Sequence, residues 1–216
     1  MEMEYFAYVL AGLALGLAPT MYFLRRVSVP PGHALLVTGG RVPKVYFDAV
    51  FLWSIRHRSE LLDLRVQTLR VRKSGKEGLL CRNNIRVDVS VVLSLCISKD
   101  VNDIILVAQT VGAERASKPS ALEALFQHRV VEAMRVAFKK RDFHEVTEQL
   151  LDLAQDVIDI IGPDLNGYHL ESLSIESVEQ TPIELLDPKN IQDAEGIRKI
   201  NERTAMERIV AAELEQ

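Results

Sequence analysis

IRVDVSVVLSLCIS, residues 85–98, is the stretch that most clearly determines the fold of this chain. Apolar residues occupy every second position from Ile85 to Ile97, and polar residues such as Arg86 and Asp88 stand between them. A period of two is typical of a β-strand, because successive side chains of a strand point to opposite faces of the sheet. The pattern therefore predicts a long strand with one face on a hydrophobic core and one face toward water.

Residues 61–73 (LLDLRVQTLRVRK) alternate in the same way and predict a second half-buried strand. The loop at residues 74–78 contains two glycines, so the two strands should pair antiparallel around it. Closer to the N-terminus, residues 33–38 predict a strand, and the β-branched and aromatic residues 42–53 predict one or two more.

Beyond residue 98 the apolar period changes to three and four, which is typical of helices. Helices are expected over residues 100–110, 120–140, 142–161 and 187–216, with capping boxes starting at Ser120 and Asp142 and a cap at Asp187. A returning strand is expected over residues 168–178. This order predicts an α+β fold with a curved antiparallel sheet, helices packed on it and a projecting C-terminal helix.

Residues 5–24 (YFAYVLAGLALGLAPTMYFL) carry no charge and are long enough, as a helix, to cross a hydrocarbon core of about 30 Å. Glu2 and Glu4 disfavour a cleaved signal, which needs a basic start, and a buried core helix is the remaining alternative. The sequence therefore predicts a retained transmembrane helix. Its interfacial, proline and flanking residues are Tyr5, Tyr8, Pro19, Tyr22, Leu24, Arg25 and Arg26.

The flanking charges predict a topology. No Lys or Arg precedes the run, whereas Arg25 and Arg26 follow it at once, and positive residues favour the cytoplasmic side. A single-pass protein of the inner (plasma) membrane is expected, with a short N-terminus outside and the rest in the cytoplasm. The aromatic residues Phe47, Phe51 and Trp53 lie close behind this exit. They belong either to the sheet core or to a surface that touches the membrane.

Composition and motifs argue against most enzymatic functions. A net charge of −4 gives no nucleic-acid footprint, and the two cysteines and five histidines show no metal-ligand spacing. No nucleophile elbow, phosphate-binding loop or dinucleotide motif occurs. Ser117 beside Lys118 is the nearest candidate for a nucleophile and base, but adjacent residues seldom face each other. We therefore expect no catalytic, cofactor-binding or metal-binding site.

Several segments together resemble the SPFH (band 7) proteins, which include stomatins, prohibitins and flotillins. They are the apolar run, the Pro30-Pro31-Gly32 exit, the LDLRVQTLRVR strand and residues 162–200, GPDLNGYHLESLSIESVEQTPIELLDPKNIQDAEGIRKI. The likeness is greatest to bacterial flotillin-like inner-membrane proteins. It implies a transmembrane anchor at residues 1–26, an SPFH domain at 27–182 in two subdomains (about 27–98 and 99–182), and the start of a coiled-coil assembly helix at 183–216.

The resemblance implies a scaffold that binds membrane lipids, assembles into homo-oligomeric rings or cages and organises membrane microdomains. The alternative is a regulatory subunit of a membrane protease or transporter, and a small NfeD-like membrane protein is a further expected partner. In the last helix, apolar positions recur at a spacing that drifts around the helix, which suits contacts with neighbours on two sides or folding back onto the domain. The expected oligomerisation residues are Ile191, Ile197, Ile200, Met206, Ile209 and Val210.

Overall fold

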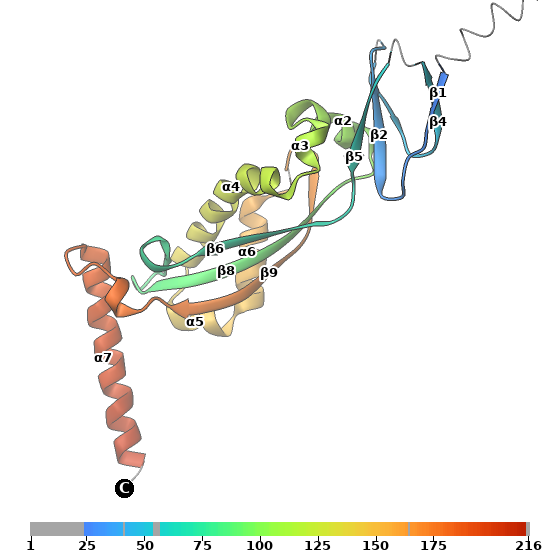
Figure 1. Ribbon diagram of the computed structural model, residues 1–216. Coiled ribbons are helices and arrows are strands. Elements are labelled where there is room, and N and C mark those ends of the chain that lie inside the picture. The colour runs from blue at the N-terminus through green and yellow to red at the C-terminus, as the bar shows by residue number, and fades with distance from the viewer. Residues whose placement is uncertain (1–23, 41, 54–56, 164, 215–216) are drawn as a thin grey trace, which may run out of the picture. The chain divides into compact units, whose positions relative to one another are not determined.

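The computed structural model describes residues 24–40, 42–53, 57–163 and 165–214. The described chain divides into two compact units (Figure 1). Unit 1 takes the chain up to Arg65 and then residues 97–118, and unit 2 takes residues 66–96 and 119–216. Each unit is therefore built from two separate stretches of sequence.

Unit 1 consists of short antiparallel strands and two helices. Strand β2 (His33–Thr38) lies between β3 (Lys44–Tyr46) and β5 (Arg58–Asp63), and β1 (Leu24–Val27) pairs with β4 (Val50–Trp53). The helices are α2 (Val101–Thr110), capped by Asp100, and α3 (Ala113–Ala116). The strand at 33–38 and the two strands within 42–53 confirm the prediction. Leu35, Val37 and Leu52 form a core cluster that joins β2 to β4.

The end of the expected transmembrane helix was predicted wrongly. Leu24, Arg25 and Arg26 belong to strand β1, because their backbone pairs with Trp53, Leu52 and Phe51 of β4. The remaining anchor residues Tyr5, Tyr8, Pro19 and Tyr22 lie outside the described residues. Among the helices that the structure does describe, none is long and apolar enough to span a bilayer.

Unit 2 is organised around strand β8 (Arg86–Ile97), as the alternation predicted. Every second position from Val87 to Ile97 is apolar and buried, each less than 5% exposed. Strand β6 (Gln67–Lys73) pairs antiparallel with β8 in the register Val71↔Val91, and β7 (Leu79–Leu80) pairs with its start. On its other side lies β9 (Tyr168–Gln180), which also pairs with β8. The Thr181 N–H donates to the Arg86 carbonyl, so the end of β9 lies beside the start of β8.

Residues 61–73 form two strands, one in each unit, rather than the single strand expected. The break follows Asp63, whose carboxylate accepts hydrogen bonds from both the N–H and the side chain of Arg65. The Leu64 N–H donates to the Gly32 carbonyl instead of to a sheet partner. These local bonds compete with the ladder and end β5, although the apolar alternation continues through the break.

The helices of unit 2 cover its sheet. Helix α4 (Pro119–Lys139) buries one apolar face, which includes Leu122, Phe126, Val130 and Met134, while Leu125 is exposed; its contacts include β6 and α6. The helix starts at Pro119, so the cap expected at Ser120 is wrong; proline suits the first helical position because its missing N–H needs no partner there. The capping box at Asp142 is confirmed, but the helix expected over 142–161 is interrupted at Gln149 into α5 (Phe143–Glu148) and α6 (Leu150–Ile161).

Unit 2 also contains two short 3-10 helices and the long C-terminal helix. The 3-10 helices are η1 (Gly75–Glu77), in the loop before β7, and η2 (Ile183–Leu185), after β9. Helix α7 (Ile191–Leu214) begins later than expected, because Asn190 caps it by accepting the Gln192 N–H at 2.9 Å. Asp187, the expected cap, instead accepts the N–H of Lys189 in the preceding turn.

Candidate functional site

Two features of unit 2 could carry function, and the first is the attachment of α7 to the sheet. Arg86, the first residue of β8, donates from Nε and Nη2 to Asp193 Oδ1 at 3.1 and 2.8 Å. Its Nη1 donates to the carbonyls of Lys76 and Gly78. Only 12% of the Arg86 side chain and 8% of the Asp193 side chain are exposed. The pair is thus a largely buried, fully hydrogen-bonded link between α7, β8 and the η1 loop.

A close backbone approach reinforces this link. A Cβ atom added to Gly196 of α7 would lie 2.5 Å from the carbonyl oxygen of Asn84, so only glycine fits at this position. Asn84 itself adopts a positive φ of 62°, which asparagine tolerates better than most residues. Its side chain donates to Glu195 Oε2 at 2.8 Å, and Lys199 Nζ donates to the Asn83 carbonyl at 3.0 Å.

Apolar packing completes the attachment, which we call the α7 clamp (Arg86, Asp193, Gly196 and the contacts of residues 83–85 with α7). Ile200 is 6% exposed and clusters with Ile85 and Leu186, and Ile197 packs against this cluster. These two expected oligomerisation residues therefore contact their own chain. Sequence reasoning missed the clamp, although an isolated glycine within a helical pattern is a signal of close packing.

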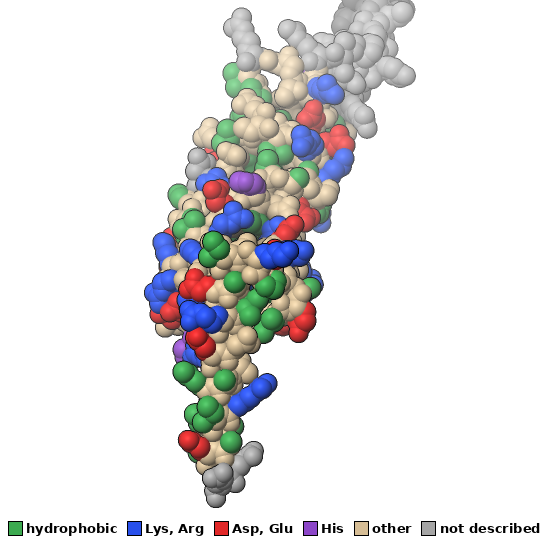
Figure 2. Space-filling model, turned by 90° about the vertical axis from the view of Figure 1, so that its left-hand side faces the viewer, with side chains coloured by type: hydrophobic (Ala, Val, Ile, Leu, Met, Phe, Trp, Pro, Cys, Tyr) green, Lys and Arg blue, Asp and Glu red, His purple; other side chains and the backbone are tan. Residues whose placement is uncertain are grey.

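The second feature is the unclamped half of α7. Every residue from Asn201 to Leu214 is exposed. Its apolar residues Met206, Ile209, Val210 and Leu214 are 50 to 83% exposed, and Met206 and Leu214 stand three to four residues before and after the pair Ile209 and Val210. Figure 2 shows hydrophobic side chains open to solvent along this narrow end of the molecule. We call these four residues the distal stripe. Ile191, at the start of the helix, is also exposed.

The clamped residues Ile197 and Ile200 and the distal stripe use different faces of the helix. At about 100° per residue, Ile197 and Ile200 point roughly 140° away from the centre of the distal stripe. The drift noted in the sequence thus corresponds to two separate apolar surfaces, one after the other along α7. The first is used within the chain, and the second has no partner among the residues that the structure describes.

In unit 1, the residues behind the expected exit divide between core and surface. Val50 packs against the core cluster of Leu35, Val37 and Leu52. Phe47 and Phe51 are 42 and 65% exposed. Phe51 stands opposite Arg26 in the β1–β4 ribbon, and the backbone of Trp53 stands opposite Leu24. Unit 1 therefore presents aromatic and basic residues beside the first described residues of the chain.

The candidate catalytic pair does not assemble. The Ser117 hydroxyl donates to the Ala113 carbonyl and accepts the Asp63 N–H, while Lys118 pairs with Glu114. Burial raises the pKa of the Cys81 thiol to about 12, which leaves it protonated and unreactive. Within the described residues, no group of three acidic, histidine or cysteine side chains could hold a metal ion.

Comparison with known proteins identifies the family. A sequence model described as SPFH domain / Band 7 family matches residues 27–216. This chain belongs to the SPFH/Band 7 family. The matched region of this SPFH chain includes all of unit 2, with the whole of α7, and unit 1 from Val27 onward.

Two curated relatives support the assignment. The flotillin family inner membrane protein YqiK of Escherichia coli (strain K12) is 32% identical over 189 residues, which are 86% of this chain and 32% of the relative. The flotillin family inner membrane protein sll1021 of Synechocystis sp. is 23% identical over 202 residues, which are 90% of this chain and 30% of the relative. The SPFH chain thus spans about a third of the length of these relatives.

Proposed function

We propose that this SPFH chain is a membrane-anchored, homo-oligomeric scaffold that organises membrane microdomains. The observation that carries the proposal is the distal stripe on a helix whose first turns are clamped to the domain. The naming of both relatives as inner membrane proteins supports membrane association. In this proposal residues 5–23 form a single span, the N-terminus is outside and the SPFH domain is cytoplasmic, where membrane proteins such as an NfeD-like partner or a protease could join it.

The clamp favours assembly through α7 for a mechanical reason. Because the first turns are fixed by a buried ion pair and a glycine contact, the rest of the helix holds a defined direction relative to unit 2. An apolar stripe about 140° wide on such a helix is normally buried, since exposed apolar patches usually mark interaction sites. Parallel helices of neighbouring copies would bury it, with Ile191 at the start of the same seam.

We expect that replacing the distal stripe by serine (Met206, Ile209, Val210 and Leu214→Ser) disassembles the oligomer and leaves the domain folded. The reason is that all four side chains are exposed and contribute no packing to their own unit. Native mass spectrometry of the whole chain in detergent measures the assembly, and circular dichroism measures the fold. Leu151 and Leu185→Ser, which also remove exposed apolar side chains of unit 2, serve as the control. Oligomers of unchanged size in the distal variant would refute assembly through this stripe.

The β1–β4 ribbon supports a membrane-facing surface in unit 1. Strand β1 begins directly after the proposed span, and β4 pairs with it. Because paired strands lie about 4.8 Å apart, β4 is close to the point where the chain would leave the membrane. Phe51 and Phe47 are exposed, and Arg26 beside Phe51 is exposed too. Aromatic rings with neighbouring cations suit the interface between headgroups and acyl chains. We therefore propose that Phe47, Phe51 and Trp53 touch the cytoplasmic leaflet.

The single tryptophan of the chain allows a direct test. In vesicles of brominated phosphatidylcholine, Trp53 fluorescence should be quenched most strongly by bromines near the glycerol end of the acyl chains. The control is Trp53→Phe combined with Leu151→Trp, which moves the fluorophore to an exposed position of unit 2 and should abolish the quenching. Trp53 fluorescence that brominated lipid leaves unchanged would contradict membrane contact by this strand.

A further inference from the structure

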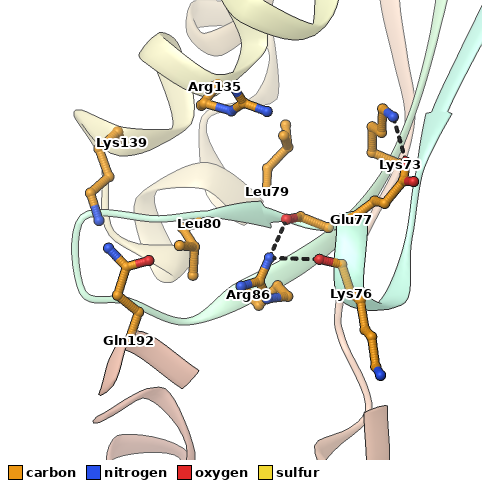
Figure 3. A pocket seen from close by; sticks show the side chains of 10 residues that line it. Lys73, Lys76, Glu77, Leu79, Leu80, Arg86, Arg135, Lys139 and Gln192 are labelled. Carbon is orange, nitrogen blue, oxygen red and sulfur yellow. Dashed lines mark hydrogen bonds and ion pairs between the residues drawn. The ribbon is translucent and has the colours of Figure 1, made fainter. Parts of the chain in front are cut away.

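A cavity of about 570 Å³ in unit 2 is lined mainly by cationic side chains (Figure 3). Arg135 and Lys139 reach it from α4, and Leu79 and Leu80 of β7 lie between them and the η1 loop. Five of its ten lining residues are basic and one, Glu77, is acidic. The basic residues are Lys73, Lys76, Arg86, Arg135 and Lys139.

Two of these five cations are neutralised within the protein. Arg86 pairs with Asp193, and Lys73 pairs with Glu77 at 2.6 Å. Among the described residues, Lys139 Nζ donates to two neutral oxygens, Asn84 Oδ1 at 2.8 Å and the Cys81 carbonyl at 3.5 Å. Arg135 makes no hydrogen bond or ion pair with any residue that the structure describes.

The two cations from α4 line the same cavity, with the charged end of Arg135 directed toward Leu79 and that of Lys139 toward Gln192 (Figure 3). Arg135 and Lys139 are four residues apart, and like charges at this spacing destabilise a helix. A bound anion would turn this repulsion into attraction. Arginine offers a planar fork of donors that matches phosphate oxygens, and lysine adds a compact positive charge.

We propose that this cavity binds a phosphate-bearing anion, with the phosphate held between Arg135 and Lys139. The cavity exceeds the volume of a single phosphate, and Leu79 and Leu80 give it an apolar wall for a larger attached group. The same chemistry is offered by a soluble phosphate compound and by the headgroup of an anionic phospholipid. The site is independent of the distal stripe and of the membrane surface proposed for unit 1.

The test uses the whole chain in nanodiscs of phosphatidylcholine and titrates pyrophosphate by calorimetry. Arg135→Gln with Lys139→Gln should weaken binding about tenfold or more, because charge-assisted hydrogen bonds are lost. Arg72→Gln with Lys140→Gln is the matched control: it removes the same charge from exposed positions outside the cavity and should bind like the parent chain. Arg135→Gln alone, which breaks no bond within the protein, keeps the test valid if the double variant unfolds.

The source of the phosphate is resolved by a second titration in nanodiscs that contain phosphatidylglycerol. Reduced pyrophosphate affinity there, through competition by the lipid headgroup, assigns the site to an anionic phospholipid; unchanged affinity assigns it to a soluble compound. The proposal is overturned if pyrophosphate and phosphatidylglycerol both fail to bind, or if the control pair weakens binding equally. It is also overturned if the cavity variants change only the size of the oligomer, because an acidic side chain of a second copy would then fill the cavity.

Discussion

Replacing Asp193 by alanine is expected to lower the free energy of unfolding of unit 2 by about 3–5 kcal/mol, because it leaves the Arg86 guanidinium buried without its counter-charge. The two carbonyls that Arg86 also contacts cannot neutralise it. The loss of stability cannot exceed the free energy that holds α7 against the sheet, because α7 can detach and return Arg86 to water. Urea unfolding followed by circular dichroism, together with hydrogen exchange of residues 191–200, separates global unfolding from local undocking.

The matched control lies on the same helix. Glu202 pairs with Arg198 at 2.9 Å, but both side chains are more than half exposed, and exposed pairs contribute little to stability. Glu202→Ala should therefore leave the urea midpoint nearly unchanged. Equal midpoint shifts in the two variants would show that burial of the Arg86–Asp193 pair is not what stabilises the clamp. Arg86→Met with Asp193→Leu, which removes both charges, should recover part of the loss.

Gly196→Ala is expected to have the second large effect on the free energy of unfolding. The sign of this effect shows whether α7 packs closely against the Asn84 backbone. In an ordinary helix this change stabilises by roughly 0.5–1 kcal/mol, because alanine loses less backbone entropy. Here the new Cβ would meet the Asn84 carbonyl at 2.5 Å, and a backbone atom in a tight turn cannot move aside cheaply. We expect a loss of about 1–3 kcal/mol, as for overpacking of a core.

The measurement compares Gly196→Ala with Asn201→Ala, an exposed position further along α7. Asn201→Ala should raise the unfolding midpoint slightly, through helix propensity alone. Gly196→Ala should lower it and speed hydrogen exchange at residues 83–85 and along the first turns of α7. A stabilised Gly196→Ala variant would mean that α7 does not approach the sheet this closely in solution.

The local patterns of the sequence predicted the elements better than they predicted their ends. Strand β8 was predicted because burial of one face imposes a period of two on the side chains. The break after Asp63 was not predicted, because Leu62, Leu64 and Val66 continue the alternation in the sequence. In the structure, however, Leu62 is fully buried and Val66 is half exposed. Only the hydrogen bonds of the folded chain distinguish these positions.

The clamp was beyond sequence reasoning for a different reason. Arg86 and Asp193 are 107 positions apart, and each fits a solvated face in its own local pattern. Their partnership depends on how α7 returns to the sheet after β9, which no short motif encodes. The distal stripe could be predicted because its spacing is local. The packing of Ile197 and Ile200 inside the fold could not be predicted, since nothing in their spacing distinguishes them from the residues of the distal stripe.

The pairing of β9 with β8, a strand much earlier in the chain, has a consequence for synthesis on the ribosome. β6 and β8 can form a hairpin as soon as residue 97 has emerged, but β9 begins only at Tyr168. At about 5–20 residues per second, the intervening 70 or so residues take roughly 4–14 s. During that interval one edge of a long, apolar strand has unpaired backbone groups, which is a template for pairing with the wrong chain. The nascent chain therefore passes through a period in which α4 and α6 can cover the face of the hairpin, but only the arrival of β9 protects its edge.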